Sequence, residues 1–163
     1  MVKALSQTGE QKDVKNSVFL TLGNSNKSHS SERQTFKKSE RLKSRNLIKQ
    51  VLETGQSFTI PPFKAFYTQV KLEVDVSVQF GIGVPKKKIR KAHDRNRIKR
   101  LVSEAYRLNK SKLYDVLKEQ NRQLALFVIY TGEVDPPFTE IESKINLILD
   151  RLKNDSAVHP KDA

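Results

Sequence analysis

The sequence contains no cysteine, and only three of its 163 residues are histidine. The lack of cysteine excludes disulfides, thiolate metal sites and thiol catalysis. No stretch approaches the run of about 18 apolar residues that a membrane-spanning helix requires, and the N-terminus lacks the apolar segment of a secretion signal. We therefore expect a cytoplasmic protein without a membrane-spanning segment.

Acidic residues with the spacing of metal ligands are missing from the predicted core. Glu73 and Asp75 fall in a predicted turn, and Asp135 precedes two prolines, where a turn is also expected. Two of the histidines lie in predicted tails, and His93 adjoins a group of cations. We assign no catalytic residue and no metal ligand to this chain, so any chemistry must come from a partner.

Positive charge is abundant and unevenly placed. The formal net charge is +13, and residues 86–112 alone contain twelve Lys and Arg against two acidic residues. So concentrated a positive field attracts polyanions and makes their binding salt-dependent. The composition thus points to nucleic acid or to an anionic membrane surface.

The chain divides into one predicted domain and two tails. Residues 1–35 are rich in Ser, Asn, Gln and Lys and are predicted to be a disordered extension. Residues 36–153 have the length of a single core, and residues 154–163 are predicted to be a flexible tail.

Helix and strand signals are regular in the predicted domain. Ser44 is a predicted cap of a short helix that ends at Gly55. Two strands are expected next, over residues 63–72 and, from a strict apolar alternation, over 76–84.

The second half of the domain begins with a long helix in the basic segment. Either His93 or Asp94 is expected to cap it, and it should run to about residue 108, with a shorter helical continuation. Residues 124–130 form an apolar run typical of a buried strand, and a capping box at Thr139 and Glu142 predicts a last helix. The order α-β-β-α-β-α predicts an α+β fold, a two-layer α/β sandwich of about four strands and three helices.

The basic helix is amphipathic. Its apolar positions fall in one sector, which we expect to bury against the sheet: Ile98, Leu101, Val102, Ala105 and Leu108. A solvated charged face is the ordinary explanation of such a helix. Here, however, Glu104 is the only carboxylate between Arg95 and Arg107, so phosphate oxygens are the better partners. A membrane-lying helix is disfavoured because the apolar residues are needed for the core.

The choice between DNA and RNA rests on weaker signals. No helix-turn-helix layout precedes the basic helix. Phe63, Phe66 and Tyr67 could stack on unpaired bases, which favours single-stranded RNA, or could pack in the core. Gly81 and Gly83 leave one strand face without bulk, for close approach by RNA or for tight helix packing.

The segment "GIGVPKKKIRKA" followed by "RNRIKR" resembles the protein component of bacterial ribonuclease P. The resemblance extends over about residues 36–153 and implies an α/β sandwich with an uncommon left-handed βαβ crossover. It also implies that an RNA subunit catalyses cleavage of precursor tRNA, with Mg²⁺ bound mainly by that RNA and the substrate and with no organic cofactor. The protein would then be the RNA-binding subunit of an endoribonuclease. The alternative is a ribosomal or RNA-assembly protein of similar fold, without a reaction.

The resemblance further implies two groups of binding residues. The catalytic RNA would be bound by Lys86, Lys87, Lys91, Arg95, Asn96, Arg97, Lys99, Arg100 and Arg107. A cleft for the 5′ leader of precursor tRNA would be lined by Ile48, Leu52, Lys64 and either Phe66 or Tyr67. Ile48 and Leu52 stand where relatives often have Phe, which places more of the stacking on the strand aromatics.

Overall fold

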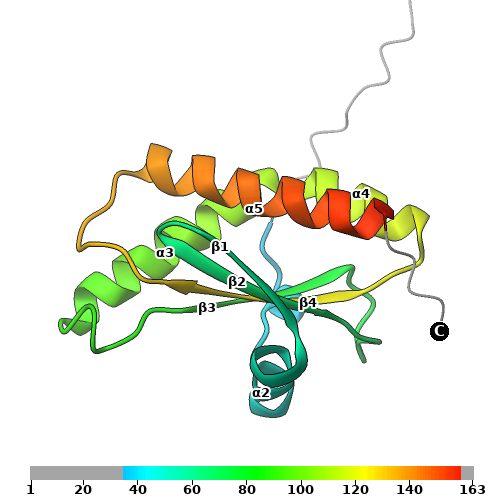
Figure 1. The fold of residues 1–163 in the computed structure, drawn as a ribbon, viewed down its shortest axis with the longest axis horizontal. Coiled ribbons are helices and arrows are strands. Elements are labelled where there is room, and N and C mark those ends of the chain that lie inside the picture. The colour runs from blue at the N-terminus through cyan, green and yellow to red at the C-terminus, as the bar shows by residue number, and fades with distance from the viewer. Residues whose placement is uncertain (1–34, 159–163) are drawn as a thin grey trace, which may run out of the picture. The chain divides into compact units, whose positions relative to one another are not determined.

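The computed structural model describes residues 35–158 (Figure 1). The prediction of a disordered N-terminal extension falls on residues outside this range, Thr35 excepted. The elements are η1 (Lys38–Glu40), α2 (Arg45–Thr54), β1 (Gln56–Ile60), β2 (Phe63–Gln69), β3 (Val78–Gly83), α3 (Ala92–Asn109), α4 (Ser111–Glu119), β4 (Leu124–Tyr130) and α5 (Phe138–Val158). Because α5 continues to Val158, the first five residues of the predicted tail are helical. No helix in the described range is long and apolar enough to cross a membrane.

The four strands form one mixed sheet in the order β1-β2-β4-β3, which confirms the predicted α+β class. β1 pairs antiparallel with β2 through a turn at Pro61 and Pro62, and β2 pairs antiparallel with β4. β3 and β4 are adjacent and parallel, and α3 and α4 connect them, so the βαβ unit is present. Its left-handed sense stays a prediction. β1 was not among the strands placed from the sequence.

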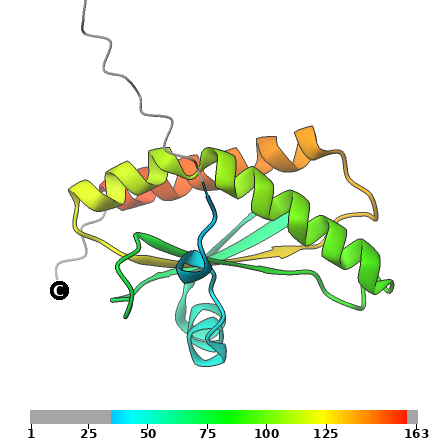
Figure 2. The same cartoon turned by 180° about the vertical axis from the view of Figure 1, so that it is seen from behind.

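Helices lie on both faces of the sheet. α3, α4 and α5 cover one face, and α2 lies alone against the other (Figures 1 and 2). The strands direct alternate side chains toward the three-helix side. These side chains form the core with the helices and include Phe63, Ala65, Val78, Phe80, Leu126 and Val128.

The predicted cap of α2 is confirmed, whereas the predicted starts of α3 and α5 are wrong. The Ser44 hydroxyl accepts a hydrogen bond from the Leu47 amide at 3.4 Å, as expected of a cap. In α3 the Lys91 carbonyl accepts the first helical bond, so His93 and Asp94 lie inside the first turn and cap nothing. Asp94 is still well placed there, because a carboxylate in the first turn is stabilised by the helix dipole.

The last helix begins before its predicted capping box. The Pro137 carbonyl accepts a hydrogen bond from the Ile141 amide at 3.3 Å, so helical geometry has started by Phe138. Thr139 therefore lies inside α5 rather than at its cap. The two prolines before Phe138 restrict the backbone and set the entry point of the helix.

A buried ion pair joins the start of the described chain to the junction of α3 and α4. The Lys110 ammonium lies 2.6 Å from Glu40 Oε1 and donates to the Thr35 carbonyl at 2.7 Å. The Tyr114 hydroxyl also donates to Glu40, at 3.0 Å, and the Lys37 amide does so at 2.7 Å. Both charged groups are buried, so this network supplies the polar partners that their desolvation requires.

Removing the buried cation should destabilise the fold. In Lys110→Met the Glu40 carboxylate stays buried without its cation, which should lower the free energy of unfolding by about 3 kcal/mol or more. Lys112→Met, at an exposed position of α4, is the matched control. Urea denaturation followed by circular dichroism measures both variants, and equal midpoints for the two would show that the pair contributes nothing to stability.

Candidate nucleic-acid interface

The apolar side of α3 fixes which way its cations face. Ile98, Val102 and Ala105 are buried against the sheet as predicted. Tyr106 is also fully buried and stacks on Phe80, with ring centroids 4.0 Å apart and an interplanar angle of 6°. The buried stripe is therefore rotated toward Tyr106. Leu101 is consequently only partly buried, and Leu108, predicted to face the core, is 37% exposed.

The connection from β3 to α3 carries several of the predicted RNA-binding lysines. Lys86 and Lys87 are exposed, whereas Ile89 is buried and anchors the connection in the core. The Arg95 guanidinium donates to the carbonyls of Ile89 at 3.0 Å and Arg90 at 2.6 Å. Arg95 thus fastens this connection to the first turns of α3, a role that its place in a basic run did not predict.

Two further arginines have carboxylate partners within the protein. Arg97 pairs with Asp135 of the β4–α5 connection at 2.6 Å. Arg107 pairs with Glu104 one turn earlier, also at 2.6 Å, and this hydrogen bond lowers the pKa of the Glu104 carboxyl. The Asp135 contact was not foreseen, because that residue was read only as part of a turn.

The remaining predicted groups of α3 and its cap face outward. Lys91, Asn96 and Arg100 are exposed, and Lys99 is partly so. Within residues 35–155, no carboxylate lies within 4.0 Å of the charged group of Lys99 or Arg100. A hollow of about 390 Å³ on this surface is lined by His93, Asn96, Arg97 and Arg100.

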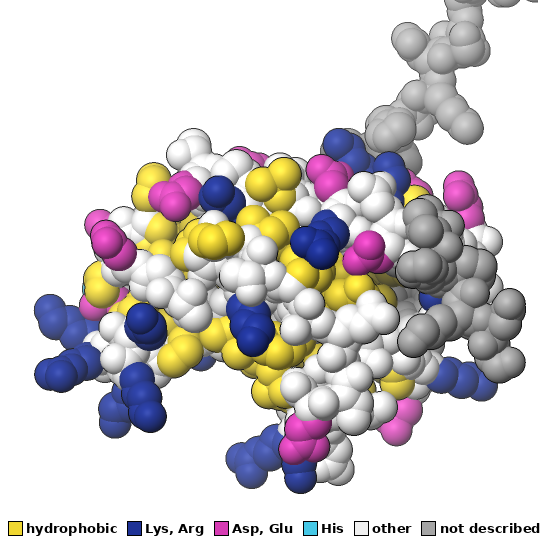
Figure 3. Space-filling view, viewed as in Figure 1, with side chains coloured by type: hydrophobic (Ala, Val, Ile, Leu, Met, Phe, Trp, Pro, Cys, Tyr) yellow, Lys and Arg dark blue, Asp and Glu magenta, His cyan; other side chains and the backbone are white. Residues whose placement is uncertain are grey.

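Lys and Arg side chains project together at one end of the molecule. Figure 3 shows them at the lower left, over the start of α3 and the connection that precedes it. The electrostatic field there is strongly positive, and the buried apolar side of α3 holds the helix that carries many of these cations in place. This end of the domain is suited to docking on a polyanion.

The opposite face of the sheet carries the predicted leader-cleft residues of β2. Phe66 is half-buried and pairs across strands with Phe127 of β4. The Lys64 ammonium lies 5.0 Å from the centroid of the Phe66 ring, in a cation–π contact. An aromatic ring and a cation thus stand side by side on the face that α2 partly covers.

The two glycines of β3 make room for an aromatic ring of the neighbouring strand. A Cβ at Gly81 would lie 2.7 Å from the ring of Phe127, and one at Gly83 would lie 3.1 Å from it. Packing of the Phe127 ring is enough to explain these glycines. The sequence suggested close approach by RNA or by a helix, and neither is needed.

The α2 residues of the predicted cleft are differently placed. Val51 is fully buried against the sheet, and Ile48, one turn earlier on the same side of the helix, is half-buried. Leu52 is 38% exposed. Both predicted residues remain accessible beside the face that carries Phe66.

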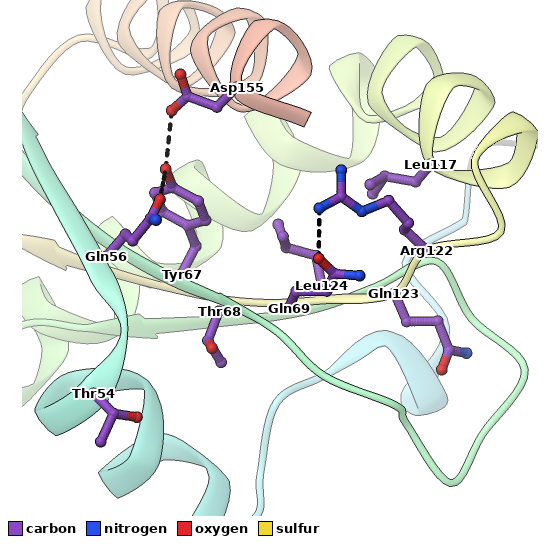
Figure 4. A pocket seen from close by; sticks show the side chains of 10 residues that line it. All are labelled: Thr54, Gln56, Tyr67, Thr68, Gln69, Leu117, Arg122, Gln123, Leu124 and Asp155. Atoms are coloured by element: carbon purple, nitrogen blue, oxygen red, sulfur yellow. Dashed lines mark hydrogen bonds between the residues drawn. The ribbon is translucent and has the colours of Figure 1, made fainter. Parts of the chain in front are cut away.

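Tyr67 points to the other side of the sheet from Phe66. Its hydroxyl lies 2.6 Å from Gln56 Oε1 and 2.9 Å from Asp155 Oδ2, at the edge of a pocket of about 300 Å³ (Figure 4). Burial, followed by the hydrogen bond to Asp155, raises the pKa of Tyr67 to about 12. Of the two candidate aromatics, Phe66 is the one that shares a face with α2.

In the part of the chain that the structure describes, no three His, Asp or Glu side chains are grouped so that they could hold a metal ion.

Comparison with known proteins gives concordant matches. The family model described as Ribonuclease P matches residues 36–153. A ribonuclease P protein component of Porphyromonas gingivalis is 36% identical over 115 residues, which cover 71% of this chain and 84% of that protein. One from Legionella pneumophila is 37% identical over 82 residues, covering 50% and 69%. The solved ribonuclease P protein of Thermotoga maritima superimposes with a TM-score of 0.54 at 25% identity, covering 68% of this chain and 96% of that one.

Removing one cation from α3 should weaken RNA binding in a salt-dependent way. Arg100→Gln deletes one exposed charge, so the slope of log K against log salt should fall by about one. Arg95→Gln should weaken binding further, because it also releases the connection before α3. Filter binding over a series of salt concentrations measures both, with Lys118→Gln in α4 as the control. A slope that Arg100→Gln leaves unchanged would mean that this face does not meet phosphate.

Proposed function

Because this chain belongs to the ribonuclease P protein family, we propose that the basic end of its domain docks on the RNA subunit of that enzyme. The chain is a protein subunit of ribonuclease P, the ribonucleoprotein endonuclease that removes the 5′ leader from precursor tRNA. The observation that carries the docking proposal is the outward row of cations on α3, which the buried side of the same helix orients.

The interface that we propose has two kinds of contact. Lys86, Lys87, Lys91, Lys99 and Arg100 would meet phosphates directly, because they project into solvent wholly or in part. Arg95 would contribute by holding the connection before α3 in place. The predicted set also includes Asn96, Arg97 and Arg107. The two arginines would contact a phosphate in place of the carboxylate that each one pairs with in the free protein.

We further propose that the RNA subunit carries the catalysis. Mg²⁺ would be bound mainly by that RNA and by the substrate, because phosphate oxygens are hard ligands of the kind that Mg²⁺ prefers. The protein would lower the magnesium requirement by placing cations beside phosphates that otherwise repel one another. We place the complex in the cytoplasm, together with its RNA partner.

The α2 side of the sheet is the proposed path of the 5′ leader. Phe66 offers a ring for stacking an unpaired base, and Lys64 offers a charge for the adjoining phosphate. Ile48 and Leu52 would add apolar contact from α2.

Reconstitution tests the proposed function. Purified protein mixed with a bacterial ribonuclease P RNA should accelerate cleavage of precursor tRNA at low Mg²⁺, measured in single-turnover reactions. Protein that binds the RNA without accelerating cleavage would instead support a non-catalytic RNA-assembly role. Protein that does not bind the RNA would contradict the family-based docking proposal.

The leader path has its own test. Phe66→Leu keeps an apolar side chain but removes the ring, so the affinity gained from a leader should fall by about 1 kcal/mol, or roughly fivefold. The measurement compares binding of the reconstituted enzyme to precursor tRNA and to mature tRNA. Tyr67→Phe, on the opposite face of the sheet, should leave this difference unchanged. An equal loss of affinity for mature tRNA would mean that Phe66 does not act through the leader.

A further inference from the structure

The ion pair between Arg97 and Asp135 is open to solvent on both sides. The two charged atoms lie 2.6 Å apart, and the side chains are 56% and 60% exposed. An exposed pair contributes little to stability, and fold stability therefore does not account for this contact. The geometry does bear on RNA docking, because the carboxylate occupies one side of a cation in the proposed interface.

The β4–α5 connection holds the Asp135 carboxylate in position. The Thr131 amide donates to the Pro62 carbonyl at 2.9 Å, and the Tyr130 hydroxyl donates to the Glu133 carbonyl at 3.0 Å. Pro136, directly after Asp135, is buried. The carboxylate is thus presented to α3 from an anchored segment rather than from a free tail.

The backbone of Asp135 supports the same conclusion. Its φ of 69° lies in the left-handed region, which Asp and Asn tolerate better than other residues with a side chain. In this conformation the carboxylate contacts α3, a helix that lies far from Asp135 in sequence. Figure 2 shows the two connections, before α3 and before α5, at the same end of the sheet.

We propose that Asp135 is an affinity-limiting residue that stands in for an RNA phosphate at Arg97, and that RNA must displace it to dock. The inference rests on the proposed function. A carboxylate oxygen and a phosphate oxygen accept the same guanidinium hydrogen bonds, so one excludes the other from the same side of Arg97. The bound RNA would gain one ion pair and break another, which reduces both its net affinity and its release of counterions.

The test is a charge-neutralising change that preserves the backbone. Asp135→Asn retains a residue suited to the positive φ and removes the competing charge. Affinity for ribonuclease P RNA should rise about two- to fivefold, the range expected from an exposed ion pair, and the salt slope should steepen by about one. Glu133→Gln is the matched control, because it removes the same charge from the same connection without touching the pair.

A double-mutant cycle isolates the contact with Arg97. In an Arg97→Gln background, Asp135→Asn should give no more than the small gain of Glu133→Gln. A gain that survives there, equal gains for Asp135→Asn and Glu133→Gln, or weaker binding by Asp135→Asn would each overturn the inference.

Failure of the proposed function and failure of this inference give different results. Wild-type protein that fails to bind the RNA would overturn the proposed function together with this inference, whereas binding without the expected gain overturns the inference alone. If Asp135→Asn lowers the thermal midpoint, Asp135→Gly provides the same charge change, since glycine also accepts a positive φ.

Discussion

The packing of α3 against β3 and α5 fixes the direction in which the cations leave the helix. Val102 and Ala105 have no exposed surface, and the ring of Tyr106 stacks on Phe80, so close packing opposes rotation of the helix about its axis. Lys and Arg side chains are individually flexible, but their attachment points are held by this core. The backbone that carries these cations therefore loses little conformational freedom on binding RNA, and the entropy cost is confined to the side chains.

Contacts within the protein already engage several of the cations on α3. Arg97 and Arg107 each lie beside a carboxylate, and Arg95 is engaged by backbone carbonyls, while Lys99 and Arg100 lack a carboxylate within ion-pairing distance in the described range. The cations of α3 are therefore not equivalent. Some support the interface, some must exchange a partner, and others are ready to meet phosphate.

The sequence predicted several features whose signal is local, although the predicted caps of α3 and α5 were wrong. Ser44 and the apolar run of β4 were placed correctly, because neighbouring residues alone indicate this cap and this buried strand. β1 was missed because its five residues, three of them polar, lie between a glycine and two prolines. The pairs Glu40–Lys110 and Arg97–Asp135 join distant parts of the chain, so no local spacing reveals them. Strand alternation already predicted that Phe66 and Tyr67 lie on opposite faces, but which of these faces α2 covers became clear only with the structure (Figure 1).

The bare surface of β3 has a consequence for how the family's sequences can vary. The Phe127 ring occupies the space that side chains at positions 81 and 83 would need, so glycine suits both positions. The three positions form a size-complementary set across two strands, in which a smaller residue at 127 would permit larger ones at 81 and 83. Relatives with bulk on this strand should then show a compensating reduction on its neighbour, and such covariation would report packing rather than contact with RNA.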